Sequence, residues 1–208
     1  VRPGVVFPTG GGGSVTDAAV AGILVEEVYR WNTDTVKYTG WKESGGENLG
    51  NGFETYYTSA ARLGYDGKSL LDELRKRIMK TALPNLWIEQ GGGGIETLSA
   101  VPSCINEMLL QGYEGVIRVF PVWPKDKDAS FRNLRAHGSF LVSSSCKNNV
   151  VEYVTIISEK GRDLTFLNPW KGKKVEIIDK VAGKRVGEGE FIKMNTQAGQ
   201  NYRFAMVE

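Results

Sequence analysis

Residues 105–144 read INEMLLQGYEGVIRVFPVWPKDKDASFRNLRAHGSFLVSS, and the spacing of apolar side chains changes within this stretch. Before Gly112 the apolar residues recur at three- and four-residue intervals, which is the spacing of one helix face. After Gly112 the apolar residues alternate with polar ones, which predicts strands. The sequence therefore predicts an α+β protein with a helical region over residues 1–112 and a β-sandwich over residues 113–208.

The helical region contains four segments with a helical apolar pattern. They are a segment capped by Ser14 or Thr16 and running to Trp31, then Phe53–Leu63, Ser69–Lys80, and a segment introduced by Pro102 and closed by Gly112. The sequence leaves open whether Ile95–Val101 continues into the last helix, because a proline inside a helix costs about 3 kcal/mol.

The strand region contains seven short segments separated by turn residues such as Asn148-Asn149 and Ala182-Gly183. Several short strands at this spacing are typical of a β-sandwich. The predicted strands are Val116–Phe120, Phe140–Ser145, Val150–Ser158, Asp163–Leu167, Lys174–Ile178, Phe191–Asn195 and Tyr202–Val207.

The composition excludes several classes of protein. The 208 residues carry a net charge of +2 and 41% hydrophobic residues, which suits a globular protein, and the dispersed basic residues argue against nucleic acid as a partner. No apolar run reaches the length of a membrane span, and no signal peptide is evident. Cys104 and Cys146 lack metal-ligand spacing, so we expect core thiols, no metal and no cofactor.

Four consecutive glycines, Gly91–Gly94, lie between Glu89 and Glu96. Ordering glycine costs more backbone entropy than ordering any other residue, so such a run needs a local reason. Phosphate binding is disfavoured, because no Lys-Ser/Thr follows the glycines and the two glutamates would repel an anion. The other interpretation is a loop, including Gly93 and Gly94, that brings the backbone close to a ligand.

A second glycine-rich segment, WKESGGENLGNG, contains Trp41, Glu47 and Asn48. Carboxylates, a flat aromatic ring and amides are the groups that sugar sites use for acid–base chemistry, stacking and hydroxyl recognition. We therefore predict Glu96 or Glu89 as catalytic, and Trp41, Glu47, Asn48, Gly93 and Gly94 as substrate-binding. The alternative is that Glu96 favours the first turn of a helix and that Trp41 is a core residue.

His137, the single histidine, and the run Ser143–Ser145 are the other candidates for chemistry. A serine-hydrolase triad would depend on His137, and no supporting motif surrounds it. We interpret His137 as a surface or structural residue.

The stretch Ile105–Ser144 resembles the C-terminal part of bacterial glycoside hydrolase family 95 proteins, the α-L-fucosidases. The resemblance rests on the Asn-Glu-Met-Leu-Leu-Gln helix, the Gly-Val-Ile strand, a Pro-x-x-Pro segment and the Leu-Arg-Ala-x-Gly-x-Phe motif. It implies the closing part of an (α/α)6 barrel followed by a β-sandwich, inverting hydrolysis of α-linked fucose or a related sugar, and a secreted or periplasmic protein.

The resemblance also concerns the glycine loop. In that family an Ile-Asp-Gly-Asn-like motif before the helix carries an aspartate that helps to activate water. Here the corresponding residues are Ile88-Glu89-Gln90-Gly91 or Gly94-Ile95-Glu96, with glutamate in place of aspartate and a longer spacing to the helix. The family's general acid lies further upstream, so the resemblance implies a chain that is inactive alone.

Half a barrel would expose apolar helix faces, so we expect a partner: a missing N-terminal catalytic region or a second copy of the chain. The alternative function is a non-catalytic carbohydrate-binding or scaffold module. In that hypothesis the side chains of Trp41, Trp87, Trp123 and Trp170 stack on sugar or pack in a core.

Overall fold

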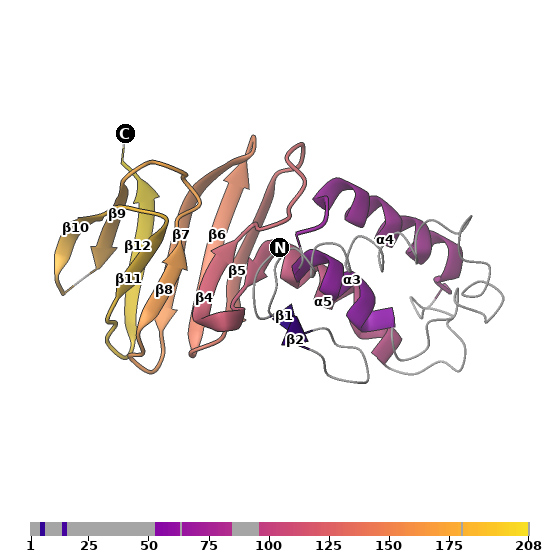
Figure 1. The fold of residues 1–208 in the computed structure, drawn as a ribbon, viewed down its shortest axis with the longest axis horizontal. Coiled ribbons are helices and arrows are strands. Elements are labelled where there is room, and N and C mark those ends of the chain that lie inside the picture. The colour runs from indigo at the N-terminus through magenta and orange to yellow at the C-terminus, as the bar shows by residue number, and fades with distance from the viewer. Residues whose placement is uncertain are drawn as a thin grey trace. The chain divides into compact units, whose positions relative to one another are not determined.

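The computed structural model describes residues 5–6, 14–15, 53–62, 64–84, 96–179 and 181–207, and all structural statements below concern these residues. The chain divides into two compact units, Val1–Met108 and Leu109–Glu208 (Figure 1). Each unit is described separately.

The described part of the first unit shows three helices that the sequence predicts. The helix predicted from Ser14 or Thr16 to Trp31 lies outside the described residues except at its start, where Ser14 and Val15 form a short strand. The elements are β1 (Val5–Val6), β2 (Ser14–Val15), α3 (Phe53–Arg62), α4 (Gly67–Thr81) and α5 (Glu96–Leu109).

Helix α4 shows why these segments are helical. Its N-cap is Asp66, whose carboxylate accepts a hydrogen bond from the Ser69 backbone N–H at 2.8 Å. The helix therefore begins two residues before the predicted start at Ser69. Leu70 and Leu74 are buried one turn apart, as expected for an amphipathic helix that contacts α3.

Helix α5 is continuous from Glu96 to Leu109 with Pro102 in its interior. The residues around position 100 therefore do belong to the helix, which settles the alternative that the sequence leaves open. Proline removes one backbone hydrogen bond from the helix. Cys104 and Met108, in the C-terminal half of α5, are fully buried, and this apolar burial offsets part of the cost.

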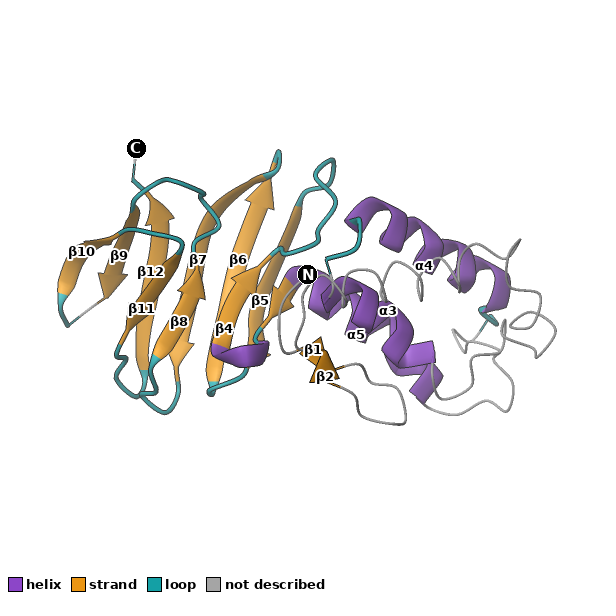
Figure 2. Cartoon of the chain, in the orientation of Figure 1, coloured by secondary structure: helices purple, strands orange, loops and turns teal. Residues whose placement is uncertain are grey.

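The second unit, which we call the β-sandwich unit, forms two sheets (Figure 2). The six-stranded sheet has the order β10-β9-β12-β7-β6-β5 and the four-stranded sheet the order β11-β8-β4-β3. Its elements are β3 (Leu110–Gln111), the short helix η2 (Tyr113–Gly115), β4 (Val116–Val119), β5 (Ala129–Ala136), β6 (Phe140–Lys147), β7 (Val150–Ser158), β8 (Leu164–Leu167), β9 (Val175–Asp179), β10 (Gly183–Gly187), β11 (Phe191–Met194) and β12 (Gln200–Met206).

All seven predicted strands are present, with ends that differ by at most two residues. Strands β3, β5 and β10 were not predicted. In β5 a bulge between Phe131 and Leu134 interrupts the alternation, and Asn133 adopts a φ of 53° there. Four of the five residues of β10 are exposed, so this edge strand lacks the apolar face that a sequence pattern detects.

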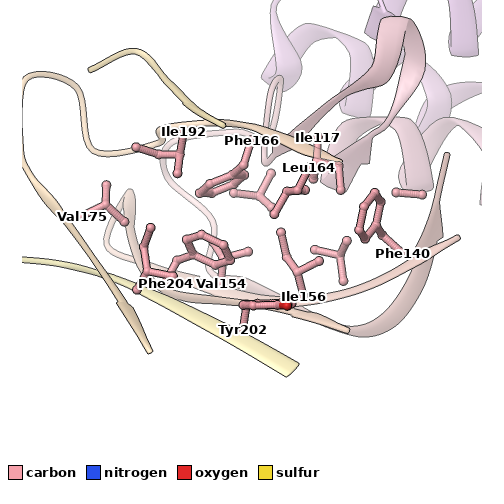
Figure 3. Close-up of a cluster of buried hydrophobic side chains, with 14 of the residues drawn as sticks. Ile117, Phe140, Val154, Ile156, Leu164, Phe166, Val175, Ile192, Tyr202 and Phe204 are labelled. Carbon is pink, nitrogen blue, oxygen red and sulfur yellow. The ribbon is translucent and has the colours of Figure 1, made fainter. Parts of the chain in front are cut away.

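The core lies between the two sheets (Figure 3). Phe166 of β8 and Phe204 of β12 are both fully buried, and their ring centroids lie 5.0 Å apart across the two sheets. Phe204 pairs in register with Val154 of β7 and Ile177 of β9, so these three residues share the inner face of the six-stranded sheet. The second unit is thus a β-sandwich-like structure, as the sequence predicts.

The helical region of the prediction is only partly supported. The three described helices show an α+β protein, but they do not constitute an (α/α)6 barrel. The assignment of residues 1–112 to part of such a barrel stays a prediction.

The core contact leads to a prediction about stability. Phe204→Ala removes the ring that meets Phe166 between the sheets, so we expect a loss of about 3–5 kcal/mol in the free energy of unfolding. Val186→Ala is a control, because Val186 is 55% exposed, and it should change stability by less than about 0.5 kcal/mol. Urea denaturation followed by near-ultraviolet circular dichroism measures both. Equal effects of the two substitutions would contradict the described core.

Candidate functional site

Most of the predicted sugar site falls outside the described residues. Glu89, Gly93 and Gly94 lie there, as do the other substrate-binding candidates Trp41, Glu47 and Asn48. Glu96 is the first residue of α5, and only its backbone is described. A helix N-terminus favours a carboxylate there, which is the structural interpretation that the sequence also allows. The catalytic and substrate-binding assignments stay predictions.

The stretch Ile105–Ser144 can be followed almost residue by residue, beginning with its helix. Glu107 in α5 forms an ion pair with Arg62 in α3, with 2.7 Å between Oε1 and Nη2. This pair joins two helices that are distant in sequence. Burial, and secondarily the Glu107 carboxylate, raises the pKa of the Cys104 thiol to about 12. The thiol therefore stays protonated, which suits a core residue.

The Leu-Arg-Ala-His-Gly-Ser-Phe motif forms the hairpin between β5 and β6. Ala136 and Phe140 are buried in the sandwich core. Gly138 has a φ of +89°, and a Cβ atom at this position would lie 2.7 Å from the Phe140 ring. Glycine is required here because its backbone is left-handed and because the aromatic ring covers it. The glycine and the phenylalanine of this motif thus have a structural function.

The arginine of the same motif, Arg135, binds Glu159, the residue directly after β7. Both guanidinium Nη atoms donate to the carboxylate, one of them at 3.2 Å to Oε1. The hydrogen bonds from Arg135 lower the pKa of Glu159, and Lys160 adds a smaller effect. A carboxylate held ionised in this way is suited to fixing a hairpin and unsuited to donating a proton as a general acid.

The serine run in β6 is engaged in the sheet. The Ser143 hydroxyl contacts the side chain of Asn133, the Ser144 hydroxyl donates to the Tyr153 carbonyl, and the Ser145 hydroxyl donates to Glu152. His137 is exposed in the β5–β6 turn. The exposure of His137 agrees with its interpretation as a surface residue.

The tryptophans of the β-sandwich unit have two different environments. Trp170 is 5% exposed, belongs to the core, and donates its indole N–H to the Val151 carbonyl at 2.7 Å. Trp123 is half-buried in the loop between β4 and β5, and its indole N–H donates to the Lys127 carbonyl at 3.0 Å. Trp170 is therefore a packing residue, whereas Trp123 is not part of the core. Trp41 and Trp87 lie outside the described residues.

Two further polar arrangements were not predicted from the sequence. Arg203 of β12 lies over the ring of Tyr153 of β7, 4.7 Å from its centroid, on the outer face of the six-stranded sheet. The side chain of Asn168, which is 5% exposed, donates to the carbonyls of Lys173 and Gly189 and accepts a hydrogen bond from the backbone N–H of Trp170. The Asn-Pro-Trp sequence after a predicted strand was a usable signal for the second arrangement, because asparagine commonly closes turns.

The described residues contain no group of three or more histidine, cysteine, aspartate or glutamate side chains arranged to hold a metal ion. The two cysteines are free and buried. In the described part of the chain, no helix is both long enough and apolar enough to cross a membrane.

Comparison with known proteins identifies no family. No family model and no curated protein matches the chain. Among solved structures, the chain is similar to a Paenibacillus polymyxa xyloglucanase from glycoside hydrolase family 44, determined with xyloglucan. The similarity covers 73% of this chain but only 30% of that enzyme, with 11% sequence identity and a TM-score of 0.25. So distant a likeness carries no argument about the function of this chain.

The Arg135–Glu159 pair leads to a prediction about pH. The pKa of Glu159 is lower in the folded protein than its ordinary value of 4.5, so the pair stabilises the fold above pH 4.5 and this contribution is lost as the pH falls through the lowered pKa. Glu159→Gln should therefore lower the melting temperature near neutral pH, and the difference from the wild type should shrink at acidic pH.

Thermal melting between neutral and acidic pH measures this effect. Arg135→Gln is the matched variant, since it removes the other partner of the pair. Because either substitution alone breaks the pair, the double variant should melt no lower than the less stable of the two single variants. A difference from the wild type that is constant at all pH values would contradict the assignment.

Proposed function

We propose that this chain is the C-terminal portion of a glycoside hydrolase that acts on α-linked fucose or a related sugar, and that it is inactive alone. The observation that carries the proposal is the resemblance of Ile105–Ser144 to the family 95 α-L-fucosidases, a run that coincides with the continuous elements from α5 to β6. Its glycine, phenylalanine and arginine have specific structural roles in the β5–β6 hairpin. These roles support the proposal by giving the residue types of the motif a structural reason in this hairpin.

Catalysis in this proposal belongs to the helical region. Glu96 or Glu89 activates the water that attacks the sugar, and the glycine loop brings Gly93 and Gly94 close to the substrate. In this proposal the helices of this chain, including α5, which begins at Glu96, form the closing part of a barrel whose other helices and general acid are supplied by a missing N-terminal region. Inverting hydrolysis needs two carboxyl groups on opposite sides of the glycosidic bond, so half of the site cannot support the reaction.

A scaffold function is the second candidate. It is supported for the β-sandwich unit by the contacts of that unit's side chains. Trp170 packs in the core, Arg203 lies over the ring of Tyr153, and Glu159 is hydrogen-bonded to Arg135. Within the described residues, these side chains are committed to the fold and not to a ligand. The two candidates are compatible if the β-sandwich unit is the non-catalytic part of the hydrolase.

Hydrolysis of aryl α-L-fucosides tests the catalytic assignment. The protein that includes the N-terminal region should be active, and either Glu96→Gln or Glu89→Gln should lower kcat by about a hundredfold or more, the effect of losing a general base. Glu73→Gln is the control, since Glu73 forms a surface ion pair with Lys76 on α4 and the substitution should leave kcat unchanged. Full activity of both glutamate variants would favour the scaffold.

Size-exclusion chromatography with light scattering tests the partner. The chain by itself should associate, or bind the separately produced N-terminal region, because incomplete helix packing exposes apolar faces. A monomer that does not bind that region would contradict the half-barrel proposal.

A further inference from the structure

The aromatic side chains of the β-sandwich unit fall into three groups. Most belong to the core or pack against it, as Phe120 and Phe131 do. Tyr113 and Tyr153 lie beneath the guanidinium groups of Arg118 and Arg203. In the described part of this unit, Trp123 and Phe191 are the aromatic residues outside both groups. Of the two, only Trp123 lies in a loop, the segment of residues 120–128 that we call the Trp123 loop.

The first anchor of the Trp123 loop is Phe120. It has a φ of 49° although it is a bulky residue followed by proline, a combination that is sterically unfavourable. Its N–H donates to the Leu109 carbonyl at 2.7 Å, and its ring centroid lies 5.3 Å from that of Phe131. The surrounding contacts therefore hold a strained backbone, which is commonest where a loop must present a side chain in a defined way.

The rest of the loop is held as firmly. Val122 and Pro124 are buried, and the Lys127 N–H donates to the Pro124 carbonyl at 3.2 Å. Asp128 accepts a hydrogen bond from the Asn148 N–H at 2.9 Å, which ties the end of the loop to the β6–β7 turn. Because the backbone is fixed at both ends, a ligand that binds this loop has little conformational entropy to remove.

The orientation of the indole is also fixed. Its single polar atom, Nε1, donates to the Lys127 carbonyl within the loop. Trp123 as a whole is half-buried, so part of the residue stays accessible to a ligand. The residues that follow it, Lys125, Asp126, Lys127 and Asp128, are all exposed. The loop thus carries a rigid aromatic side chain and, in the residues that follow it in sequence, exposed charged side chains that can donate and accept hydrogen bonds.

We propose that the Trp123 loop binds a pyranose ring of a carbohydrate. A pyranose has one face of C–H groups, whose slightly positive hydrogens match the negative face of an aromatic ring, and a rim of hydroxyl groups that both donate and accept hydrogen bonds. The indole of Trp123 supplies the aromatic ring, and the exposed residues 125–128 of the same loop supply carboxylates and ammonium groups for the hydroxyls. This inference rests on the proposed function, because it makes the β-sandwich unit a sugar contact of the hydrolase.

Nuclear magnetic resonance of the full chain labelled with 15N tests the inference. Fucosyllactose and fucosylated xyloglucan oligosaccharides, each at millimolar concentration, are the ligands. We expect shifts of the Trp123 indole resonance and of the backbone amides of Lys125, Lys127 and Asp128, while the resonance of the buried Trp170 stays unchanged. The Trp123→Phe variant identifies the Trp123 resonance by its loss. No shift in the loop with either ligand would overturn the inference.

Affinity measurements then separate the contribution of the indole ring to binding from that of the rest of the loop. Trp123→Ala should weaken binding by about tenfold or more, as expected when an aromatic anchor is removed, and Trp123→Phe should retain most of the affinity. Phe191→Ala is the matched control, because Phe191 is an aromatic residue with 42% exposure outside the loop. Equal affinities of the wild type and Trp123→Ala would overturn the inference. If Trp123→Ala does not fold, the titration of the wild type still decides.

The outcomes distinguish this inference from the proposed function. Fucoside hydrolysis by the complete enzyme without any shift in the Trp123 loop would overturn the sugar contact and leave the enzyme assignment standing. Shifts in the loop without hydrolysis would support the contact and favour the non-catalytic alternative.

Discussion

The contact between the two sheets, with Phe166 against Phe204, is the interaction on which the described structure most depends. Strand β12 lies between β7 and β9, and β8 lies between β4 and β11, so each ring sits in the interior of its sheet. Burying apolar surface between two sheets is the main favourable term in such a fold. The loops at the ends of the sandwich, including the Trp123 loop, are positioned because this core fixes the strands that carry them.

Polar contacts then close the ends of the sandwich. Asn168 bonds to Trp170 and Lys173 within the β8–β9 loop and to Gly189 before β11. The hydroxyls of Ser158 and Thr196 share a hydrogen bond of 2.6 Å and are fully or nearly fully buried. Buried polar groups are tolerated because they are hydrogen-bonded, and an unsatisfied group would cost more than such a contact contributes. These contacts explain why polar residues occur inside a region that the alternating pattern marks as apolar.

The function of a motif depends on where its residues lie in the fold. The stretch Ile105–Ser144 carries a resemblance to sugar hydrolases, yet Gly138, Phe140 and Arg135 shape and fix a hairpin. Trp170 and Trp123 show the same dependence, since one indole packs in the core and the other lies outside it in a charged loop. The chemistry that we propose for the enzyme must therefore come from the glutamates around the glycine run.

The sequence by itself determined the positions of the regular elements. Strand β7 was predicted with the bounds that it has, because alternating apolar residues are a local property of the chain. The helices α3 and α4 were predicted within two residues for the same reason. Of the candidate site, the sequence named residue types with the right chemistry, but only Glu96 lies within a described element, as the first residue of α5.

Only the tertiary structure decided which side chains meet. The parallel pairing of β4 with β8, the contact of Arg203 with Tyr153 and the pairing of Arg135 with Glu159 each join residues that are far apart in sequence. The bulge in β5 and the exposure of β10 also removed the local patterns that would have predicted those strands. The reason is that periodicity shows which face of an element is apolar, whereas the partner of that face is chosen by the packing of the whole unit.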